Sequence, residues 1–116
     1  MPEPVAFINC FAVPPGRDEE FLRLWRVVNA YMAAQPGYLD HRLHRALSPE
    51  SRYRYINVVH WASSAAWQAA HDEGFQALVS EPAWAEFPPV PALCEVLHHG
   101  ALTGGEQSGR PAREWA

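Results

Sequence analysis

The sequence lacks the short patterns that point to the commonest cofactors. It contains no CxxC, no HExxH and no glycine-rich phosphate loop, so no motif supports a zinc or nucleotide site. It also lacks an apolar run of the ~18 residues that a membrane-spanning helix needs. The first residues have neither the basic start nor the apolar stretch of a signal peptide. We therefore expect no membrane partner and a cytoplasmic location.

Positive charge and cysteine are both scarce. Nine basic and thirteen acidic residues give a net charge of −4, and no basic stripe occurs, which argues against nucleic acid as a partner. Without an export signal, Cys10 and Cys94 are expected to be free thiols. No Ser-His-Asp or Cys-His arrangement supports hydrolysis. The adjacent His98 and His99 would point to opposite sides of a strand, so no metal site is expected.

Aromatic residues are abundant instead. A chain of 116 residues fits one domain, and this one holds five Trp, four Tyr and five Phe. Such side chains fill cores and interfaces, and they also line pockets for flat apolar ligands.

Hydrophobic periodicity divides the chain into strands and helices. In chain order the pattern predicts a strand at 5–13, a helix at 18–34, strands at 38–47 and 52–62, a helix from Ser63 or Ser64, and a strand at 92–102. Gly74 weakens the second helix and is expected to divide it. A short helical turn begins at Pro82, and the prolines at 88–91 are expected to exclude regular structure there.

This order is the β-α-β-β-α-β arrangement of an α+β, ferredoxin-like domain, with a four-stranded antiparallel sheet and both helices on one face. We place the domain at residues 1–102 and a flexible tail at 103–116. The other sheet face carries apolar side chains such as Ile56 and Val58. A second copy would cover that face, so the pattern predicts a symmetric homodimer.

Asn57 and Trp61 are the residues that a plain core would not need. They are four apart in a strand, so both project to one face, about 13 Å apart. Trp25 and Trp67 can approach that face from the two helices. The result would be an aromatic cleft suited to a flat, oxygenated ring system. The alternative is that Asn57 pairs with a backbone group and Trp61 belongs to the core.

Asn9 extends this candidate site to the first strand, where Phe7 shares its face. The first and third strands are central neighbours in this topology, so Asn9 and Asn57 are expected to lie close together, either as a structural pair or as part of a polar site. His71 falls on the apolar side of the second helix. It is either a ligand or an ordinary hydrogen-bonded histidine. His41 shares a strand face with Leu39, Leu43 and Leu47, from which it can reach the cleft.

These segments resemble the antibiotic biosynthesis monooxygenase superfamily over about residues 5–100. The resemblance is carried by Ile8-Asn9, Val13 to Gly16, Phe21, Gln35 to Tyr38, Ile56 to Trp61 and Ala66-Trp67. It implies ferredoxin-like domains that pair into a dimeric α/β barrel. It also implies, for the quinone-forming branch, oxygenation of polycyclic aromatic anthrones by O₂ without metal or flavin.

The resemblance assigns roles to particular residues. Asn57 and Trp61 match the amide and indole implicated in binding substrate and stabilising charged oxygen species. Trp67 falls where that branch can carry a tyrosine, whereas its arginine at the end of the second helix has no counterpart here. His71 or His41 is a candidate base.

Haem-degrading enzymes belong to the same superfamily and provide the alternative. Asn9 matches their strand-one asparagine, but their tryptophan and axial histidine positions fall on Ala70 and Val79, which leaves His71 as the possible ligand.

Our first hypothesis is a monooxygenase without cofactor or metal, acting on a small aromatic substrate. The second is a haem-binding or haem-degrading protein, and the third is a non-catalytic small-molecule-binding dimer. The predicted site residues are Asn57, Trp61 and His71 for catalysis, and Asn9, Trp25, Trp67, Phe7 and His41 for substrate binding.

Overall fold

The computed structural model describes residues 3–100. Its elements are β1 (Val5–Phe11), α1 (Asp18–Ala33), β2 (Tyr38–Arg45), β3 (Tyr55–Trp61), α2 (Ser64–Ala70), α3 (Glu73–Val79), the 3₁₀ helix η1 (Pro82–Glu86) and β4 (Pro89–Glu95). The predicted tail at 103–116, and with it the end of the predicted domain, lies outside the described residues.

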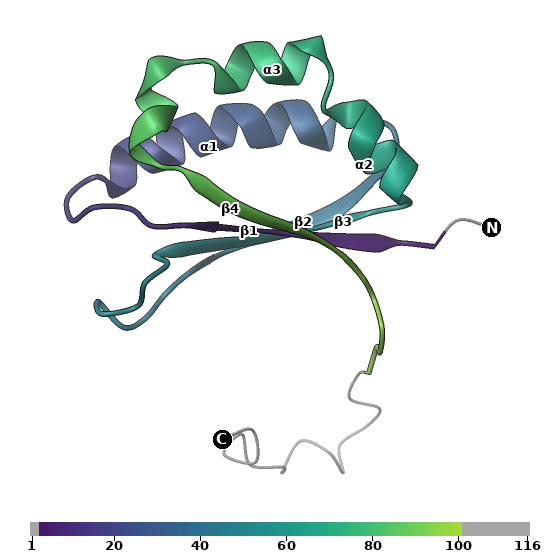
Figure 1. Ribbon diagram of the computed structural model, residues 1–116, viewed down its shortest axis with the longest axis horizontal. Helices are drawn as coiled ribbons and strands as arrows, with labels where there is room; N and C mark the ends of the chain where they lie inside the picture. Colours follow the sequence, from purple (N-terminus) through teal and green to yellow (C-terminus); the bar gives the residue numbers. More distant parts are fainter. Residues whose placement is uncertain (1–2, 101–116) are drawn as a thin grey trace.

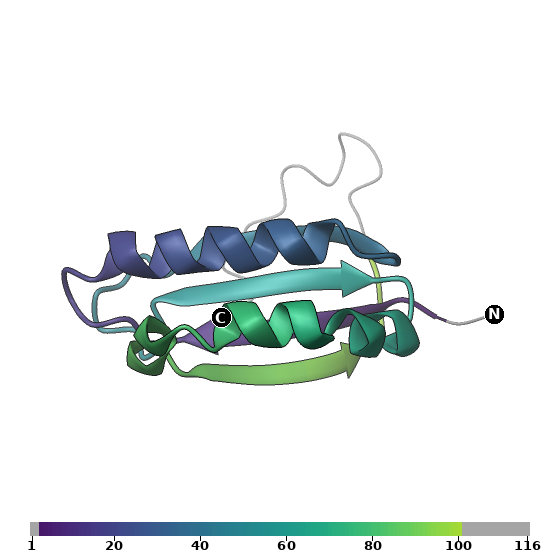
Figure 2. The same ribbon diagram turned by 90° about the horizontal axis from the view of Figure 1, so that it is seen from above.

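The four strands form one antiparallel sheet in the order β2-β3-β1-β4. All helices lie on one face of this sheet (Figure 1). Seen from above, α1 runs alongside α3 in roughly the direction of the strands (Figure 2), and the two helices are in contact. The predicted α+β, ferredoxin-like fold is therefore confirmed. None of the helices within residues 3–100 is long and apolar enough to cross a membrane.

The second helix is divided, as the sequence predicts, but the break lies at His71 and Asp72. Ser63 caps α2 by accepting a hydrogen bond from the backbone N–H of Ala66 at 3.1 Å. Asp72 caps α3 in the same way, with 3.0 Å between its Oδ1 and the backbone N of Phe75. An aspartate that can cap a new helix ends the first one more effectively than Gly74, which lies inside α3.

The loop between α1 and β2 depends on a glycine. Gly37 has φ of +88°, and a Cβ placed on it would lie 2.4 Å from the Cβ of Ala66 in α2. Only a residue without a side chain permits both this left-handed conformation and this close approach. Gly37 therefore fixes where β2 begins relative to α2.

β4 corrects the sequence-based expectation for the proline-rich segment. The strand starts at Pro89, includes Pro91 and ends at Glu95, so the predicted strand at 92–102 was placed too late. β4 is an edge strand that pairs only with β1, and a proline at an edge loses no ladder hydrogen bond on its open side. His98 and His99 lie beyond the strand.

β2 contains an irregularity that the sequence pattern did not reveal. Its register against β3 shifts between Tyr38 and Asp40, which places Tyr38 opposite Trp61 and leaves Leu39 52% exposed. The prediction that Leu39, Leu43 and Leu47 share one strand face is therefore wrong for two of them. Leu39 lies at the irregularity, and Leu47 lies beyond the strand and is fully exposed. A bulge reverses the side-chain alternation on one side of it.

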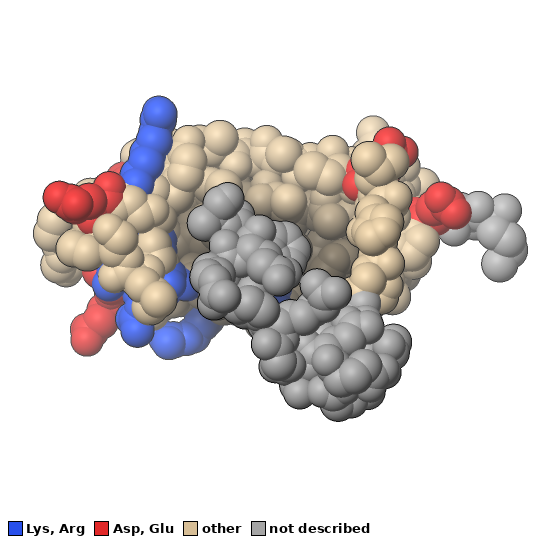
Figure 3. All heavy atoms as spheres, turned by 90° about the horizontal axis from the view of Figure 1, so that it is seen from below, with Lys and Arg blue, Asp and Glu red and all other residues tan. Residues whose placement is uncertain are grey.

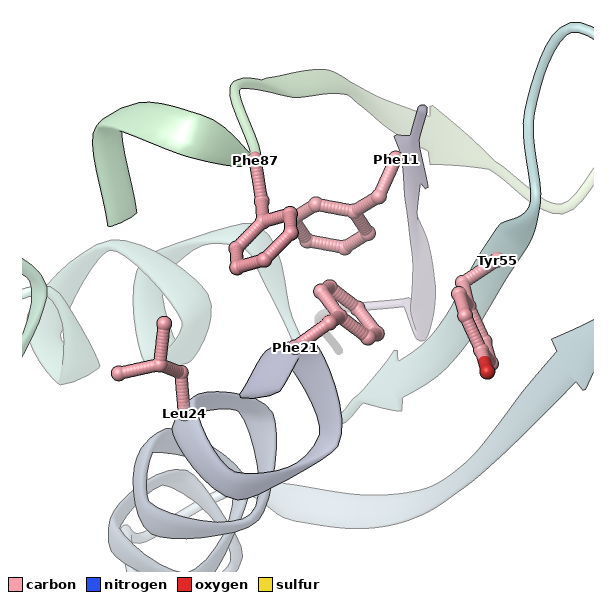
Figure 4. Close-up of a cluster of buried hydrophobic side chains, with 5 residues drawn as sticks. All are labelled: Phe11, Phe21, Leu24, Tyr55 and Phe87. Carbon is pink, nitrogen blue, oxygen red and sulfur yellow. The ribbon is translucent and has the colours of Figure 1, made fainter. Parts of the chain in front are cut away.

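One end of the helix-covered sheet face is a solid aromatic cluster, which we call the phenylalanine core: Phe11, Phe21, Leu24, Tyr55 and Phe87. Phe21 of α1 lies between Phe11 and Tyr55, with ring centroids 4.8 Å and 4.7 Å away (Figure 4). The Tyr55 hydroxyl donates to Asp18 at 2.5 Å, so the polar atom of this core has a partner. Such packing fastens the start of α1 to β1 and β3.

The opposite face of the sheet has no covering element in the described part of the chain. Ile8, Cys10, Ile56 and Val58 lie there in two cross-strand pairs and are half-buried. In Figure 3, which views the molecule from below, the visible charged side chains lie mainly toward its two ends.

Candidate functional site

A cavity of about 640 Å³ lies between the sheet and the helices. Its walls are mainly aromatic and aliphatic side chains from all four strands, α1, α2, α3 and η1. Most of the predicted site residues line it, namely Phe7, Asn9, Trp25, Asn57, Trp61, Trp67 and His71. His41 does not line it. The structure thus brings together residues that are distant in sequence around one apolar cavity.

Asn9 and Asn57 lie directly opposite each other on β1 and β3, as the topology predicted. Asn57 is only 8% exposed, and the Oδ1 atoms of both residues are buried without a hydrogen-bond partner in residues 3–100. The two amides therefore do not satisfy each other, as a structural pair would. A buried polar atom without a partner costs about 1–3 kcal/mol, and a donor from a ligand would recover that cost.

The two candidate tryptophans differ in their surroundings. Trp61 is 1% exposed and packs edge-on against Tyr38 at 5.5 Å, in a cluster with Val59 and Ala70. This is the environment of a core residue that also forms part of the cavity wall. Trp67 instead has its Nε1 buried without a hydrogen-bond partner among the described residues. The N–H of Trp67 is therefore an unsatisfied donor on a residue that lines the cavity.

His71 is held in one tautomer by its own helix. Its Nδ1 lies 2.6 Å from the backbone oxygen of Trp67, so Nδ1 carries the proton and donates it to that carbonyl. The lone pair of a neutral ring then resides on Nε2. The ring packs against Trp67 and Phe75, with centroids at 4.4 Å and 4.5 Å. Such an imidazole can accept a proton or bind a metal through Nε2.

His41 and Tyr38 form a second layer at the β2 side. Tyr38 lines the cavity and its hydroxyl is hydrogen-bonded to Nδ1 of His41, which also packs edge-on against Trp25 at 5.6 Å. Burial, together with the charge of Asp40, raises the pKa of Tyr38. His41 therefore acts on the cavity only through its neighbours. Tyr38 was not predicted as a site residue, because the sequence pattern does not reveal the bulge that follows it in β2.

Trp84 was also missed as a site residue. It comes from η1 and closes the cavity beside Phe11 and the edge-strand residue Pro89. Two ion pairs hold η1 on α1, namely Arg17 with Glu86 at 2.7 Å and Arg23 with Glu81 at 3.0 Å. The sequence feature that could have identified Trp84 is a tryptophan within a proline-rich segment. We interpreted that segment as a turn and assigned it no role in the site.

The helical walls of the cavity are tied together at the break between α2 and α3. The hydroxyl of Tyr31 donates to Oδ1 of Asp72 at 2.5 Å. This bond, with the backbone N–H of Phe75, holds the pKa of Asp72 below its usual value. A Cβ on Gly74 would lie 2.4 Å from the Tyr31 hydroxyl oxygen, so the glycine lets α1 and α3 approach each other. Met32 of α1 and Phe75 of α3, on the two helices that this bond joins, both line the cavity.

Comparison with known proteins identifies related folds. The family model described as antibiotic biosynthesis monooxygenase matches residues 4–81. A solved structure of a candidate monooxygenase from Shewanella loihica PV-4 is 35% identical, with a TM-score of 0.74, covering 85% of this chain and 99% of that one. No curated protein sequence gives a significant match.

Two further solved structures differ in their chemistry. SnoaB from Streptomyces nogalater, a cofactor-independent oxygenase, is 26% identical with a TM-score of 0.70, covering 84% of this chain and 96% of that one. A variant of MhuD with two manganese protoporphyrin IX molecules bound per active site is 27% identical with a TM-score of 0.66, covering 87% and 99%. The fold is therefore similar to proteins with and without a bound porphyrin.

Proposed function

This chain belongs to the antibiotic biosynthesis monooxygenase family, and on that basis we propose that it is a cofactor-independent monooxygenase that oxidises an aromatic or polyketide-like small molecule with O₂. The observation that carries the proposal is an aromatic cavity in which Asn9, Asn57 and Trp67 present buried polar atoms without partners. The similarity to SnoaB, a cofactor-independent oxygenase, supports the same assignment.

The chemistry needs a substrate with an acidic methylene group between aromatic rings and conjugated to a carbonyl. Nε2 of His71 accepts one proton from that carbon, and the carbanion delocalises its charge onto the carbonyl oxygen. The indole N–H of Trp67 and the amide N–H of Asn57 stabilise this oxygen in a site that excludes water. The electron-rich anion then passes an electron to O₂. One oxygen atom becomes the new carbonyl and the other leaves as water with the two methylene hydrogens.

The aromatic walls provide orientation. Phe7 and Trp67 have ring centroids 5.3 Å apart, and Trp25 faces them from α1 across the cavity lining. A flat ring system can stack on such surfaces while its oxygen atoms reach the polar groups. Trp61 contributes packing beside Asn57 on β3, so we assign it a positioning role.

Oxygen uptake by the purified protein with anthrone and no added cofactor tests this proposal. We expect Asn57→Ala and Trp67→Phe each to reduce the rate by about 100-fold, the effect of removing one donor to a developing oxyanion. Leu39→Ala, on the exposed bulge, is the matched control and should leave the rate unchanged. Uptake that persists in both variants would contradict the proposed site.

Haem binding is the second candidate, favoured by one observation. The Nδ1 of His71 donates to a backbone carbonyl, which is the arrangement that orients a metal-ligating histidine through Nε2. A bound haem would supply oxygen activation at its iron, and His71 would hold it. Titration with haemin tests this: a Soret band that disappears in His71→Ala would favour haem. Ligand-induced thermal shifts without oxygen uptake or a Soret band would favour a non-catalytic binder.

We further propose that two copies pair through the open sheet face. The half-buried pairs Ile8–Val58 and Cys10–Ile56 form an apolar stripe there. A second copy would remove this stripe from water. Light scattering at micromolar concentration should give the mass of a dimer, and Val58→Asp should shift it to that of a monomer. A monomeric unsubstituted protein would overturn the pairing.

A further inference from the structure

We propose that the cavity selects uncharged ligands: a hydroxylated, carbonyl-bearing aromatic compound binds, and its carboxylated analogue does not. The inference rests on the proposed function only in taking this cavity as the substrate site. It goes further by naming the charge and the polar groups that the substrate must have.

The lining itself carries the first part of the argument. Within residues 3–100 the cavity wall contains no aspartate, glutamate or arginine, and its polar side chains are neutral amides, indoles, Tyr38 and His71. Three of the buried polar atoms in this lining have no partner among the described residues, namely Oδ1 of Asn9, Oδ1 of Asn57 and Nε1 of Trp67. They are two acceptors and one donor, so they match ligand hydroxyl groups and a ligand carbonyl.

Nearby arginines are already engaged. Arg17 forms an ion pair with Glu86 at 2.7 Å, and Arg23 does so with Glu20 at 2.7 Å. At the other side of the phenylalanine core, Arg54 contacts Asp18 at 3.2 Å. To neutralise an anion in the cavity, any of these guanidinium groups would have to leave its carboxylate. None of these three guanidinium groups is therefore free to pair with a carboxylate ligand.

Desolvation then decides between the two ligand classes. A carboxylate that leaves water without a partner pays a penalty of several kcal/mol, because its charge is poorly solvated among aromatic side chains. A phenolic hydroxyl pays much less and satisfies an asparagine oxygen that is otherwise unpaired. Discrimination of this kind is set by the pocket and does not require turnover.

Three related probes separate charge from size: 1,8-dihydroxyanthraquinone, its 3-carboxylate and the methyl ester of that carboxylate. Quenching of tryptophan fluorescence at neutral pH gives a Kd for each. We expect the parent and the ester to bind at least about 100-fold more tightly than the carboxylate. Equal binding of the acid and the ester would overturn the inference, as would a tight complex with haemin, which carries two propionates.

Introducing an arginine into the cavity wall tests whether an added positive charge allows the carboxylate to bind. Asn29 lines the cavity from α1, whereas Val27 on the same helix is 50% exposed and does not line it. Asn29→Arg should tighten binding of the carboxylate by about tenfold or more, and Val27→Arg should not change it. Val79→Arg, on the α3 wall, replaces Asn29→Arg if that variant does not fold. No gain from an arginine on either wall would contradict the inference.

The outcome is separable from that of the proposed function. Oxygen uptake with anthrone and equal binding of acid and ester would retain the monooxygenase and reject the charge selection. Selective binding of neutral probes without oxygen uptake would retain the charge selection and reject the monooxygenase.

Discussion

The two ends of the helix-covered sheet face are built on the same pair of strands but differ in packing. At one end Phe11 of β1 pairs with Tyr55 of β3, and the phenylalanine core fills the space above them. Toward the other end the paired asparagines Asn9 and Asn57 lie under a cavity of about 640 Å³. One end is solid and the other is hollow, although α1 covers both.

Buried polar groups also differ between the two ends, because among the described residues they have hydrogen-bond partners at the solid end and lack them at the hollow end. The buried Tyr55 donates its hydroxyl hydrogen to Asp18, which also contacts Arg54. By contrast, Asn9, Asn57 and Trp67 each have a buried polar atom without a partner in residues 3–100. A protein gains stability by satisfying such atoms, so unsatisfied ones concentrated in a cavity indicate a site kept for a ligand. The comparison teaches that satisfied and unsatisfied buried polar groups occupy different ends of one sheet, and the unsatisfied end is the one we propose as the ligand site.

The largest expected effect on stability is in the solid end. Phe21 is 0% exposed and contacts three other aromatic rings of the phenylalanine core. Phe21→Ala should lower the free energy of unfolding by about 3–5 kcal/mol, because it leaves a cavity that the surrounding rings cannot fill. Urea unfolding at a fixed protein concentration measures it. Leu47→Ala, at a fully exposed position, is the control, and equal effects of the two substitutions would remove the distinction.

The contact between Tyr31 of α1 and Gly74 of α3 should have a smaller effect on the free energy of unfolding, and the sign of that effect should depend on whether Tyr31 is present. Gly74→Ala places a methyl group 2.4 Å from the Tyr31 hydroxyl, so we expect a loss of about 1–3 kcal/mol by overpacking. In a Tyr31→Ala background the same change should be neutral or stabilising by up to about 1 kcal/mol, because alanine is the better helix former. A double-mutant cycle by urea unfolding measures the difference. Additive effects would show that the two residues do not meet.

Tyr55→Phe should cost about 1 kcal/mol, the value of one hydrogen bond. The bond from Tyr55, assisted by Arg54, holds the pKa of Asp18 below its usual value. A depressed pKa contributes stability that is complete above the unfolded value of about 3.9 and is lost as pH falls through the folded value. Tyr55→Phe should therefore reduce the acid dependence of stability below about pH 4. An unchanged slope in urea unfolding from pH 5 to pH 2 would argue against this coupling.

The smallest expected effect on stability is in the hollow end. Asn57→Leu replaces an unpartnered buried amide by an apolar side chain of similar size. The free energy of unfolding should stay the same or rise by up to about 1 kcal/mol, whereas the thermal shift with 1,8-dihydroxyanthraquinone should disappear. Asn29→Leu, at the half-buried cavity wall of α1, is the matched control and should retain the ligand shift. An unfolded Asn57→Leu protein would mean that Asn57 is a structural residue.

The alternation of side chains between the two faces of β3 could be predicted from the sequence, because successive residues of a regular strand point to opposite faces. Tyr55, Asn57, Val59 and Trp61 all lie buried on the helix side, as predicted. The same reasoning failed in β2, where a bulge after Tyr38 changed the alternation. It failed again at Pro89 and Pro91, because sequence does not reveal which strand lies at an edge. Local patterns report on the backbone of one segment, and register and strand order depend on its neighbours.

The amino-acid sequence alone determined the order of the main elements, the buried face of β3, and the position of Asn9 opposite Asn57, because these follow from the periods of helices and strands and from their connectivity. Only the tertiary structure decided which polar atoms are left without partners. It showed that Nε1 of Trp67 is one of them, placed His41 behind Tyr38, and added Trp84 to the cavity wall. The physical reason is that hydrogen bonding and cavity shape are properties of several segments packed together, and no single segment contains them.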